Sequence, residues 1–328
     1  DGLSWATASN DLQAMLNDVP DGGTIRLEAG IYTPNAYPAG CVGCTYNRDF
    51  AFYANKNLTI QGGYLGGSAT PVTGAHSTIL SGDIGVLGNH SDNAHHVLLS
   101  NSLVALQNLS VRYGMANVGG SIFIDGIEIT RVNGAGIYVF DGGAVLDDVL
   151  ISNNAATNQG GGIYAKNTSL NMDRCAITDN SANQGGGLFF SNENYQIALI
   201  EKSVIANNLA NQGGAMFLSD PPRAVPSYID YSYFNFKIDF CTYYGNTASN
   251  GSVLYAPNIV DAKMVFTNSI VYGNSPNIHN HGESHLPAVN SIIQGSVVAY
   301  PPIRSKTPDY INPSDLDGID NVFFTDDD

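Results

Sequence analysis

The feature of this sequence that most restricts its fold is a two-part repeat between residues 134 and 274. One part is a glycine run followed by an aliphatic and an aromatic residue, and the other is an asparagine followed by small residues. The asparagines recur at intervals of 26, 28, 38 and 28 residues, at Asn154, Asn180, Asn208, Asn246 and Asn274. A period of this length indicates stacked structural units, none of which can bury its apolar face alone.

The apolar runs between these marks indicate that the unit is built of strands. They are short, alternating or β-branched, and glycine and asparagine bound them, which is typical of strands and not of helical repeats. About three short strands in a coil of roughly 25 residues predict an all-β fold, a parallel β-helix of about ten coils. Coils about 4.8 Å apart would stack the asparagines into a hydrogen-bonded ladder. The aromatic residues would likewise form a column of Tyr138, Tyr164, Phe189, Phe217 and Tyr255.

On this interpretation the chain has three regions. Residues 1–23 are expected to be an N-terminal cap with a short helix, because Leu12, Met15, Leu16 and Val19 recur at helical spacing. Such a helix would cover the open end of the core. Residues 24–300 would form the β-helix, and residues 301–328 an acidic C-terminal segment. Loops are expected at 33–57, 221–237 and 276–287.

The charge balance excludes some classes of partner. The 328 residues include 13 Lys and Arg against 29 Asp and Glu, which gives a formal net charge of −16. Nucleic acids and anionic membranes both require basic patches, so neither is expected as a partner. The sequence has no run of about 18 apolar residues that could span a bilayer. We expect a monomeric extracellular protein, processed or trimmed from a longer secreted chain whose signal peptide has been removed.

The four cysteines fall into two pairs. Cys41 and Cys44 lie in a glycine-containing loop, where a local disulfide is favoured over a zinc site because no second pair of ligands lies close by in sequence. Cys175 and Cys241 each precede a repeat asparagine by five residues, which places them in one column, two coils apart. That separation of about 9.6 Å exceeds the roughly 7 Å Cα distance that a disulfide tolerates, so both should be free thiols.

Several blocks of the sequence resemble a known family. Ile60-Gln61-Gly62-Gly63-Tyr64, Thr78-Ile79-Leu80-Ser81-Gly82-Asp83 and the Gly-Gly-Gly-Ile-Tyr repeats are similar to secreted bacterial right-handed parallel β-helix proteins. The similar proteins are of the choice-of-anchor and polymorphic outer-membrane-protein-repeat type. Asn312-Pro313-Ser314-Asp315 resembles the closing segment of that family. The resemblance implies a right-handed β-helix, a secreted or surface location and a frequent adhesin role, and it implies no defined catalytic set.

Binding without catalysis is the function that the sequence favours. A long wall of neutral polar and aromatic side chains suits an extracellular polysaccharide or a cell-surface glycan, because sugars dock on aromatic faces and amide groups. The aromatic stretch near residue 230 is the predicted platform, with Tyr228, Tyr231, Tyr233, Asn235 and Phe236 as ligand-binding residues. The alternative for this stretch is an insertion that packs on the wall of the β-helix.

Two other functions remain open from sequence. A glycoside hydrolase needs two carboxylates about 5 to 9.5 Å apart, and a polysaccharide lyase needs calcium and a basic group near the C–H bond that it attacks. Candidate carboxylates are Asp147, Asp148, Asp173, Asp179, Glu201, Asp230 and Asp239. Candidate bases are Arg174, Lys202 and Lys237. A structural stalk that holds another domain away from the cell is the third possibility.

Two metal sites are conceivable. Calcium is the one possible cofactor, because carboxylates crowd together near a glycine at Asp315, Asp317, Asp320, Asp326 and Asp327. The alternative is a solvated acidic tail. A loop with His279, His281, Glu283 and His285 could bind zinc, although loop histidines are more often merely exposed.

Overall fold

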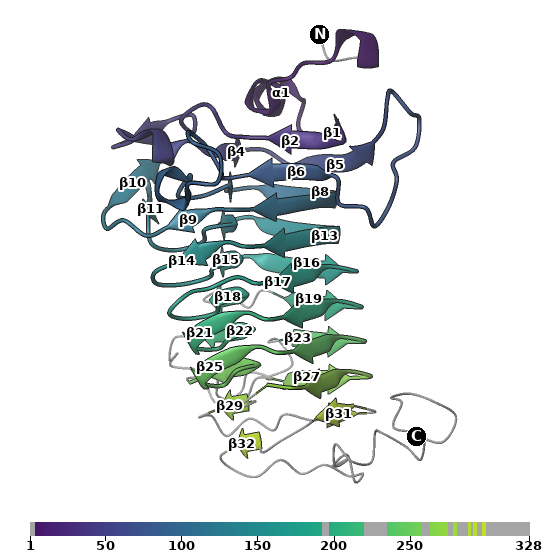
Figure 1. Cartoon of the computed structure of the whole chain (residues 1–328), viewed down its shortest axis with the longest axis vertical. Coiled ribbons are helices and arrows are strands. Elements are labelled where there is room, and N and C mark those ends of the chain that lie inside the picture. The colour runs from purple at the N-terminus through teal and green to yellow at the C-terminus, as the bar shows by residue number, and fades with distance from the viewer. Residues whose placement is uncertain are drawn as a thin grey trace, which may run out of the picture.

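The computed structural model describes residues 4–191, 197–219, 235–257, 263–274, 278–280, 288–289, 291–293 and 297–299. In that part of the chain the backbone winds into coils that stack along one long axis (Figure 1). Each coil contributes strands to stacks in which every neighbour is parallel and comes from the preceding or following coil. One of these stacks is a sheet of nine strands, to which each coil contributes one strand, so the number of coils is close to the ten expected from the repeat.

The first stack runs along one wall of the molecule. Its strands are β1 (Gly23–Glu28), β5 (Leu58–Tyr64), β8 (Leu103–Arg112), β13 (Gly143–Ser152), β16 (Ser169–Asp173), β19 (Ala198–Glu201), β23 (Asn235–Asp239), β27 (Lys263–Thr267) and β30 (Ala288–Val289). The second stack continues from the ends of β8 and β13. It contains β2 (Gly30–Tyr32), β6 (Thr78–Ser81), β17 (Ala176–Thr178), β20 (Val204–Ala206), β24 (Thr242–Tyr244), β28 (Ile270–Tyr272) and β31 (Ile292–Ile293).

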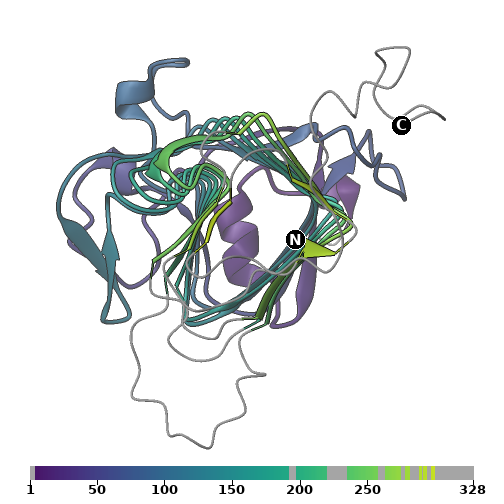
Figure 2. The ribbon, with the colours of Figure 1, turned by 90° about the horizontal axis from the view of Figure 1, so that it is seen from below.

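The third stack closes each coil. Its strands are β4 (Phe52–Ala54), β7 (Leu98–Ser100), β12 (Ile137–Phe140), β15 (Ile163–Lys166), β18 (Leu188–Ser191), β22 (Met216–Ser219), β26 (Leu254–Ala256), β29 (Ile278–Asn280) and β32 (Val297–Ala299). Two parallel two-stranded sheets lie at the turns that precede the third stack. They pair β9 (Met115–Ala116) with β14 (Ala155–Ala156), and β21 (Leu209–Gln212) with β25 (Thr247–Asn250). Seen along the axis, the coils superimpose and the helix α1 (Leu12–Asp18) lies across their interior (Figure 2).

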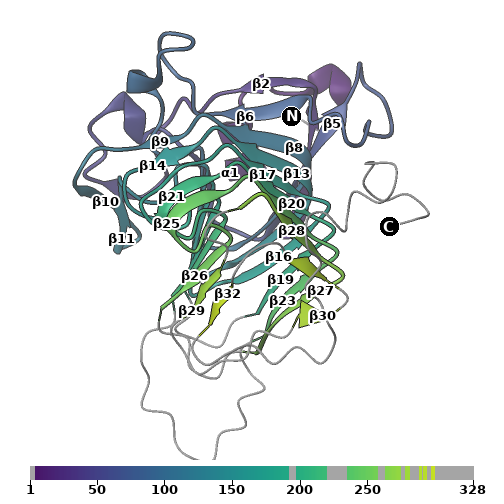
Figure 3. The same ribbon diagram turned by 60° about the horizontal axis from the view of Figure 1, so that its bottom comes forward.

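A small antiparallel sheet stands outside the coils near the N-terminal end (Figure 3). It is formed by β3 (Cys41–Val42), β10 (Ser121–Ile124) and β11 (Ile127–Thr130). Three short 3-10 helices, η1 (Trp5–Thr7), η2 (Asn47–Asp49) and η3 (His90–Asp92), complete the elements of the described chain. No helix in this part of the chain is long and apolar enough to cross a membrane.

The side-chain alternation of the strands builds two apolar layers. On β12, Ile137 and Val139 belong to the core inside the coils, whereas Tyr138 and Phe140 belong to a second buried cluster. The predicted aromatic column is confirmed in that outer cluster, because the Tyr164 and Phe189 rings lie 5.2 Å apart and nearly parallel, and Phe189 and Phe217 repeat the arrangement. The hairpin of β10 and β11 covers the N-terminal end of this cluster.

The asparagine ladder is also confirmed. The Oδ1 atom of Asn180 accepts hydrogen bonds from the backbone N–H and the side-chain amide of Asn154, each at 3.0 Å. The same two contacts recur from Asn180 to Asn208, from Asn208 to Asn246 and from Asn246 to Asn274. A second amide ladder, which joins Gln159, Gln184 and Gln212 at 2.9 Å per step, was not anticipated from the sequence.

The cysteines lie as expected. Cys41 and Cys44 form a disulfide with a Cα–Cα distance of 6.0 Å, and Cys175 and Cys241 are free and buried. The latter two share a column with Ser203, whose hydroxyl accepts a hydrogen bond from the Cys175 N–H at 3.0 Å. Burial raises the pKa of Cys175 to about 12 and that of Cys241 to about 11, so both remain inert thiols.

The expected loops contain more structure than their sequences indicated. The segment 33–57 includes β4, which pairs with β7 as a full member of the third stack. A three-residue strand such as Phe52–Ala54 is too short to show an alternating pattern, and all three of its residues are buried. The segment 221–237 ends within the fold, because β23 begins at Asn235.

Candidate functional site

Four acidic residues of the first stack form one column on the outer wall. Backbone register aligns Asp147 with Asp173, Asp173 with Glu201, and Glu201 with Asp239. Their sequence neighbours Leu146, Met172, Ile200 and Ile238 all lie in the core, so alternation directs the carboxylates outward. We refer to these four acids with Arg174, Lys202 and Lys237 as the charged ladder.

Every basic group of the charged ladder is paired. The Arg174 guanidinium bridges the carboxylates of Asp147 and Asp173. The Lys202 ammonium lies 3.1 Å from Asp173. The Lys237 ammonium lies 3.1 Å from Asp239 and 3.4 Å from Glu201. The structure therefore brings together residues that the sequence offered as catalytic candidates, but it neutralises the bases with adjacent acids.

The two ends of the charged ladder differ in their proton affinity. Partial burial raises the pKa of Asp147, and the nearby acids Asp173 and Asp148 add to the rise against the opposing effect of Arg174. Burial also acts to raise the pKa of Asp239, but hydrogen bonds from Thr267 and Asn268 outweigh it and lower the pKa. Asp239 is thus held as an anion by fixed donors, which suits a structural or binding role.

The remaining candidate carboxylates do not join the ladder. Asp148 accepts hydrogen bonds from the Gly74 N–H at 2.7 Å and from the His76 ring at 3.0 Å, and so ties the loop before β6 to the wall. Asp179 lies at a turn beside the asparagine ladder, in the left-handed region with φ of 57°. Asp230 lies outside the described residues.

Three aromatic residues lie at the turn after β23 and at the ends of β24 and β28, and we refer to Phe240, Tyr244 and Tyr272 together as the aromatic strip. Phe240 is 60% exposed at the turn after β23, and Tyr244 is 52% exposed at the end of β24. The Tyr244 and Tyr272 rings are nearly parallel, with centroids 6.1 Å apart. The sequence reasoning missed this strip, because Tyr243 and Tyr244 are adjacent and only the register shows that Tyr243 is the buried one.

The predicted aromatic platform is not supported as a whole. Phe236 is 1% exposed and its ring packs 5.9 Å from that of Phe190, so Phe236 cannot contact a surface ligand and this prediction is wrong. Its partner in the stack is Ala198, which leaves room for a large side chain inside the coil. Asn235 opens β23, while Tyr228, Tyr231 and Tyr233 lie outside the described residues.

The predicted metal ligands fall almost entirely outside the described part of the chain. The five aspartates proposed for calcium, together with His281, Glu283 and His285, lie outside the described residues, and His279 falls in β29. Within the described ranges no group of three or more His, Cys, Asp or Glu side chains is arranged to hold a metal ion.

A buried ion pair fixes the N-terminal loops and is not accessible to a ligand. The carboxylate of Asp49, 2% exposed, accepts from Arg131 at 2.6 and 2.9 Å and from the backbone N–H groups of Thr45 and Tyr46. Burial opposes its ionisation, but these hydrogen bonds hold its pKa below the usual range. The neighbouring His95 and His96 are almost fully buried, and desolvation lowers their pKa to about 3 and about 4.

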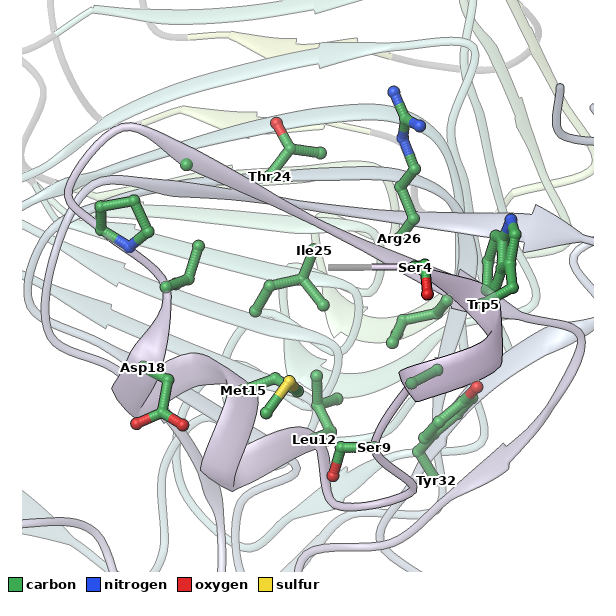
Figure 4. Close-up of a pocket in the computed structure, with 15 residues that line it drawn as sticks. Ser4, Trp5, Ser9, Leu12, Met15, Asp18, Thr24, Ile25, Arg26 and Tyr32 are labelled. Carbon is green, nitrogen blue, oxygen red and sulfur yellow. The ribbon is translucent and has the colours of Figure 1, made fainter. Parts of the chain in front are cut away.

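A cavity of about 580 Å³ lies at the N-terminal end, between β1 and the cap (Figure 4). Its apolar lining includes Leu12, Met15 and Ile25, and Trp5, Arg26 and Tyr32 also border it. The Tyr32 hydroxyl donates to the Glu28 carbonyl at 3.1 Å, and burial raises its pKa. A second hollow of about 420 Å³ shares Trp5, Arg26 and Tyr32 and extends to Gly66 and Gly67.

Comparison with known proteins supports the fold alone. The family model described as "Right handed beta helix region" matches residues 114–295, more than half of the chain. No curated protein and no solved structure gives a significant match.

Proposed function

The chain belongs to the family of right-handed β-helix proteins, and from this premise we propose that it is a non-catalytic glycan-binding module that acts outside the cell. The observation that carries the proposal is the aromatic strip. Tyr244 is 52% exposed on β24, which pairs with a strand on each side, and Phe240 is 60% exposed at the turn after β23. Rigid, exposed rings are the surfaces on which the apolar faces of sugars stack.

Polar groups beside the strip complete the chemistry that a glycan requires. Phe240 directly follows Asp239, so one end of the strip adjoins the charged ladder. Carboxylates of the ladder can accept hydrogen bonds from sugar hydroxyls, and Lys237 can donate to ring or hydroxyl oxygens. A wall of stacked coils presents these groups at a regular spacing of about 4.8 Å, which suits a linear chain of sugar units.

The pairing of the ladder favours binding over cleavage. A lyase requires a basic group that is free to remove a proton from the substrate. Arg174 and Lys237 each contact two carboxylates, and Lys202 contacts one. Asp239 and Glu201 raise the pKa of Lys237, which makes its side chain a poor proton acceptor.

A glycan array probed with the purified chain tests the proposal. We expect binding to at least one extracellular polysaccharide, and Phe240→Ala or Tyr244→Ala should weaken it about fivefold each, because each removes one stacking contact of about 1 kcal/mol. Phe123→Ala is the matched control, since Phe123 is 44% exposed on the β10 hairpin away from the strip.

Two outcomes would contradict the proposal. Full retention of binding by the Phe240→Ala/Tyr244→Ala double variant would show that the strip is not the site. New reducing ends or unsaturated products after incubation with the bound polysaccharide would show that the chain is an enzyme.

A further inference from the structure

The cavity under the cap borders the edge of a strand. Five consecutive residues of β1, Gly23 to Leu27, line it, although successive side chains of a strand point to opposite faces. Only a cavity that runs along the strand edge can touch all five. Among the described residues, β1 pairs with β5 alone, so its second edge faces this cavity.

The hydrogen-bond pattern shows which backbone groups face the cavity. The Gly22 N–H donates to the Asn57 carbonyl at 2.7 Å, toward β5, and the Gly23 N–H turns to the Pro20 carbonyl of the cap at 2.9 Å. In a parallel pair, alternate residues direct both backbone groups to the same neighbour. Thr24 therefore faces β5, and the N–H and C=O of Ile25 face the cavity.

At a different strand edge, that of β4, the cap supplies a side-chain amide that forms hydrogen bonds with the backbone. The Gln13 side chain, 5% exposed, accepts from the Tyr53 N–H at 2.8 Å and donates to the Tyr53 carbonyl at 3.3 Å. Gln13 thus pairs with β4 as the backbone of another strand would. The edge of β1 has no such side chain among the described residues, and an amide-bearing extended chain is the chemistry that would complete it.

The lining of the cavity further restricts what can bind. Leu12, Met15 and Ile25 form an apolar floor that accepts apolar side chains. Arg26 stands at the rim, and its guanidinium carbon lies 5.8 Å from the centroid of the Tyr64 ring. It contacts no carboxylate within the described part of the chain. An acidic side chain would supply the missing partner.

We propose that this cavity binds an extended peptide as an additional strand on β1, with apolar side chains toward the cap and an acidic residue paired with Arg26. The adjoining hollow past Trp5 and Arg26 toward Gly67 gives room for the chain to continue. This binding mode is independent of the glycan proposal, because the aromatic strip lies on β24, on β28 and at the turn after β23, several coils away from β1.

The single tryptophan makes the experiment site-specific, because Trp5 lines the cavity and no other residue contributes indole fluorescence. The probe is acetyl-Val-Asp-Val-Asp-Val-amide, titrated against the full chain while Trp5 emission is recorded. We expect a saturable change in emission. A peptide with Lys in place of Asp, and an Asp peptide N-methylated at alternate residues, should each bind at least tenfold more weakly.

A charge exchange sharpens the assignment to Arg26. Arg26→Glu should reverse the preference, so that the Lys peptide binds better than the Asp peptide. Arg174→Glu, which changes another exposed arginine on the distant charged ladder, should leave both affinities unchanged. Circular dichroism verifies that each variant folds, and the comparison of the three peptides on the unaltered chain stands without any variant.

The proposal is overturned by either of two results. The absence of any Trp5 response to the Asp peptide up to millimolar concentration would exclude a peptide site. Equal binding of the N-methylated peptide, or tighter binding of dodecanoate, would mean that the cavity takes apolar anions and adds no strand.

Discussion

The asparagine ladder and the charged ladder follow the same geometric rule but differ in their composition. Both place one side chain per coil at equivalent positions of stacked strands or turns. The asparagine ladder keeps the same residue over five coils, and its members are at most 7% exposed. The charged ladder mixes Asp, Glu, Arg and Lys, whose side chains are 16–55% exposed.

Burial explains the difference. Each buried asparagine must supply an acceptor for the coil before it and donors for nearby carbonyls, because no water can replace them. The amide of Asn180 donates to the carbonyls of Ile151 and Thr178 and to Asn208, so substitution would leave several groups without partners. Water completes the contacts of the exposed ladder, so any pair of opposite charges serves there.

The largest expected effect breaks the buried ladder. Asn180→Ala should lower the free energy of unfolding by about 3 kcal/mol, because it leaves the buried backbone N–H of Asn154 and two buried carbonyls without hydrogen-bond partners. Guanidinium unfolding followed by circular dichroism measures this. Asn211→Ala is the control, since it removes an exposed amide contact to Asn183 and should cost under about 0.5 kcal/mol. Equal costs for the two variants would refute the role of burial.

The same contrast explains which features the sequence could predict. The asparagine spacing and the aromatic column were recognisable because every coil must satisfy the same buried positions. The charged ladder was visible only as separate candidates, since alignment of Asp147 with Asp173 depends on strand register. The prediction for Phe236 was wrong because a run of aromatic residues does not show at which residue β23 begins.

The cap shows a similar limit. Helical spacing predicted a covering helix, and α1 is present at Leu12–Asp18. The cavity beside β1 could not be predicted, because it depends on where the helix rests. In the structure α1 contacts β4, and the cavity lies along β1.

A smaller effect is expected from a buried polar group outside the ladder. His96 is 2% exposed, and its Nε2 atom has no hydrogen-bond partner in the described part of the chain. Burial lowers its pKa from 6.5 to about 4, so below pH 6.5 the unfolded state binds a proton that the folded state does not. Stability should therefore fall as the pH is lowered from 6.5 toward 4, by about 2 kcal/mol for this residue between pH 7 and pH 5.

Thermal unfolding between pH 7 and pH 5 tests this expectation. His96→Gln should make the pH dependence shallower by about 2 kcal/mol over that interval, although His95 keeps its own contribution. Asp49 does not interfere, because its lowered pKa confines its effect to pH values below about 4. An unchanged slope in the variant would mean that His96 accepts a proton in the folded chain.

The smallest effect is expected where the exposed ladder is broken. Arg174→Gln removes both ion pairs to Asp147 and Asp173, yet the Arg174 side chain is 54% exposed and water can solvate all three groups. The free energy of unfolding should change by less than about 1 kcal/mol, and the change should disappear in about 1 M salt, which screens exposed charges. Guanidinium chloride is itself a salt, so urea unfolding is the suitable measurement. A loss of several kcal/mol that persists in salt would mean that the charged ladder, like the asparagine ladder, holds the coils together. The proposal that these groups are available to bind a glycan would then be weaker.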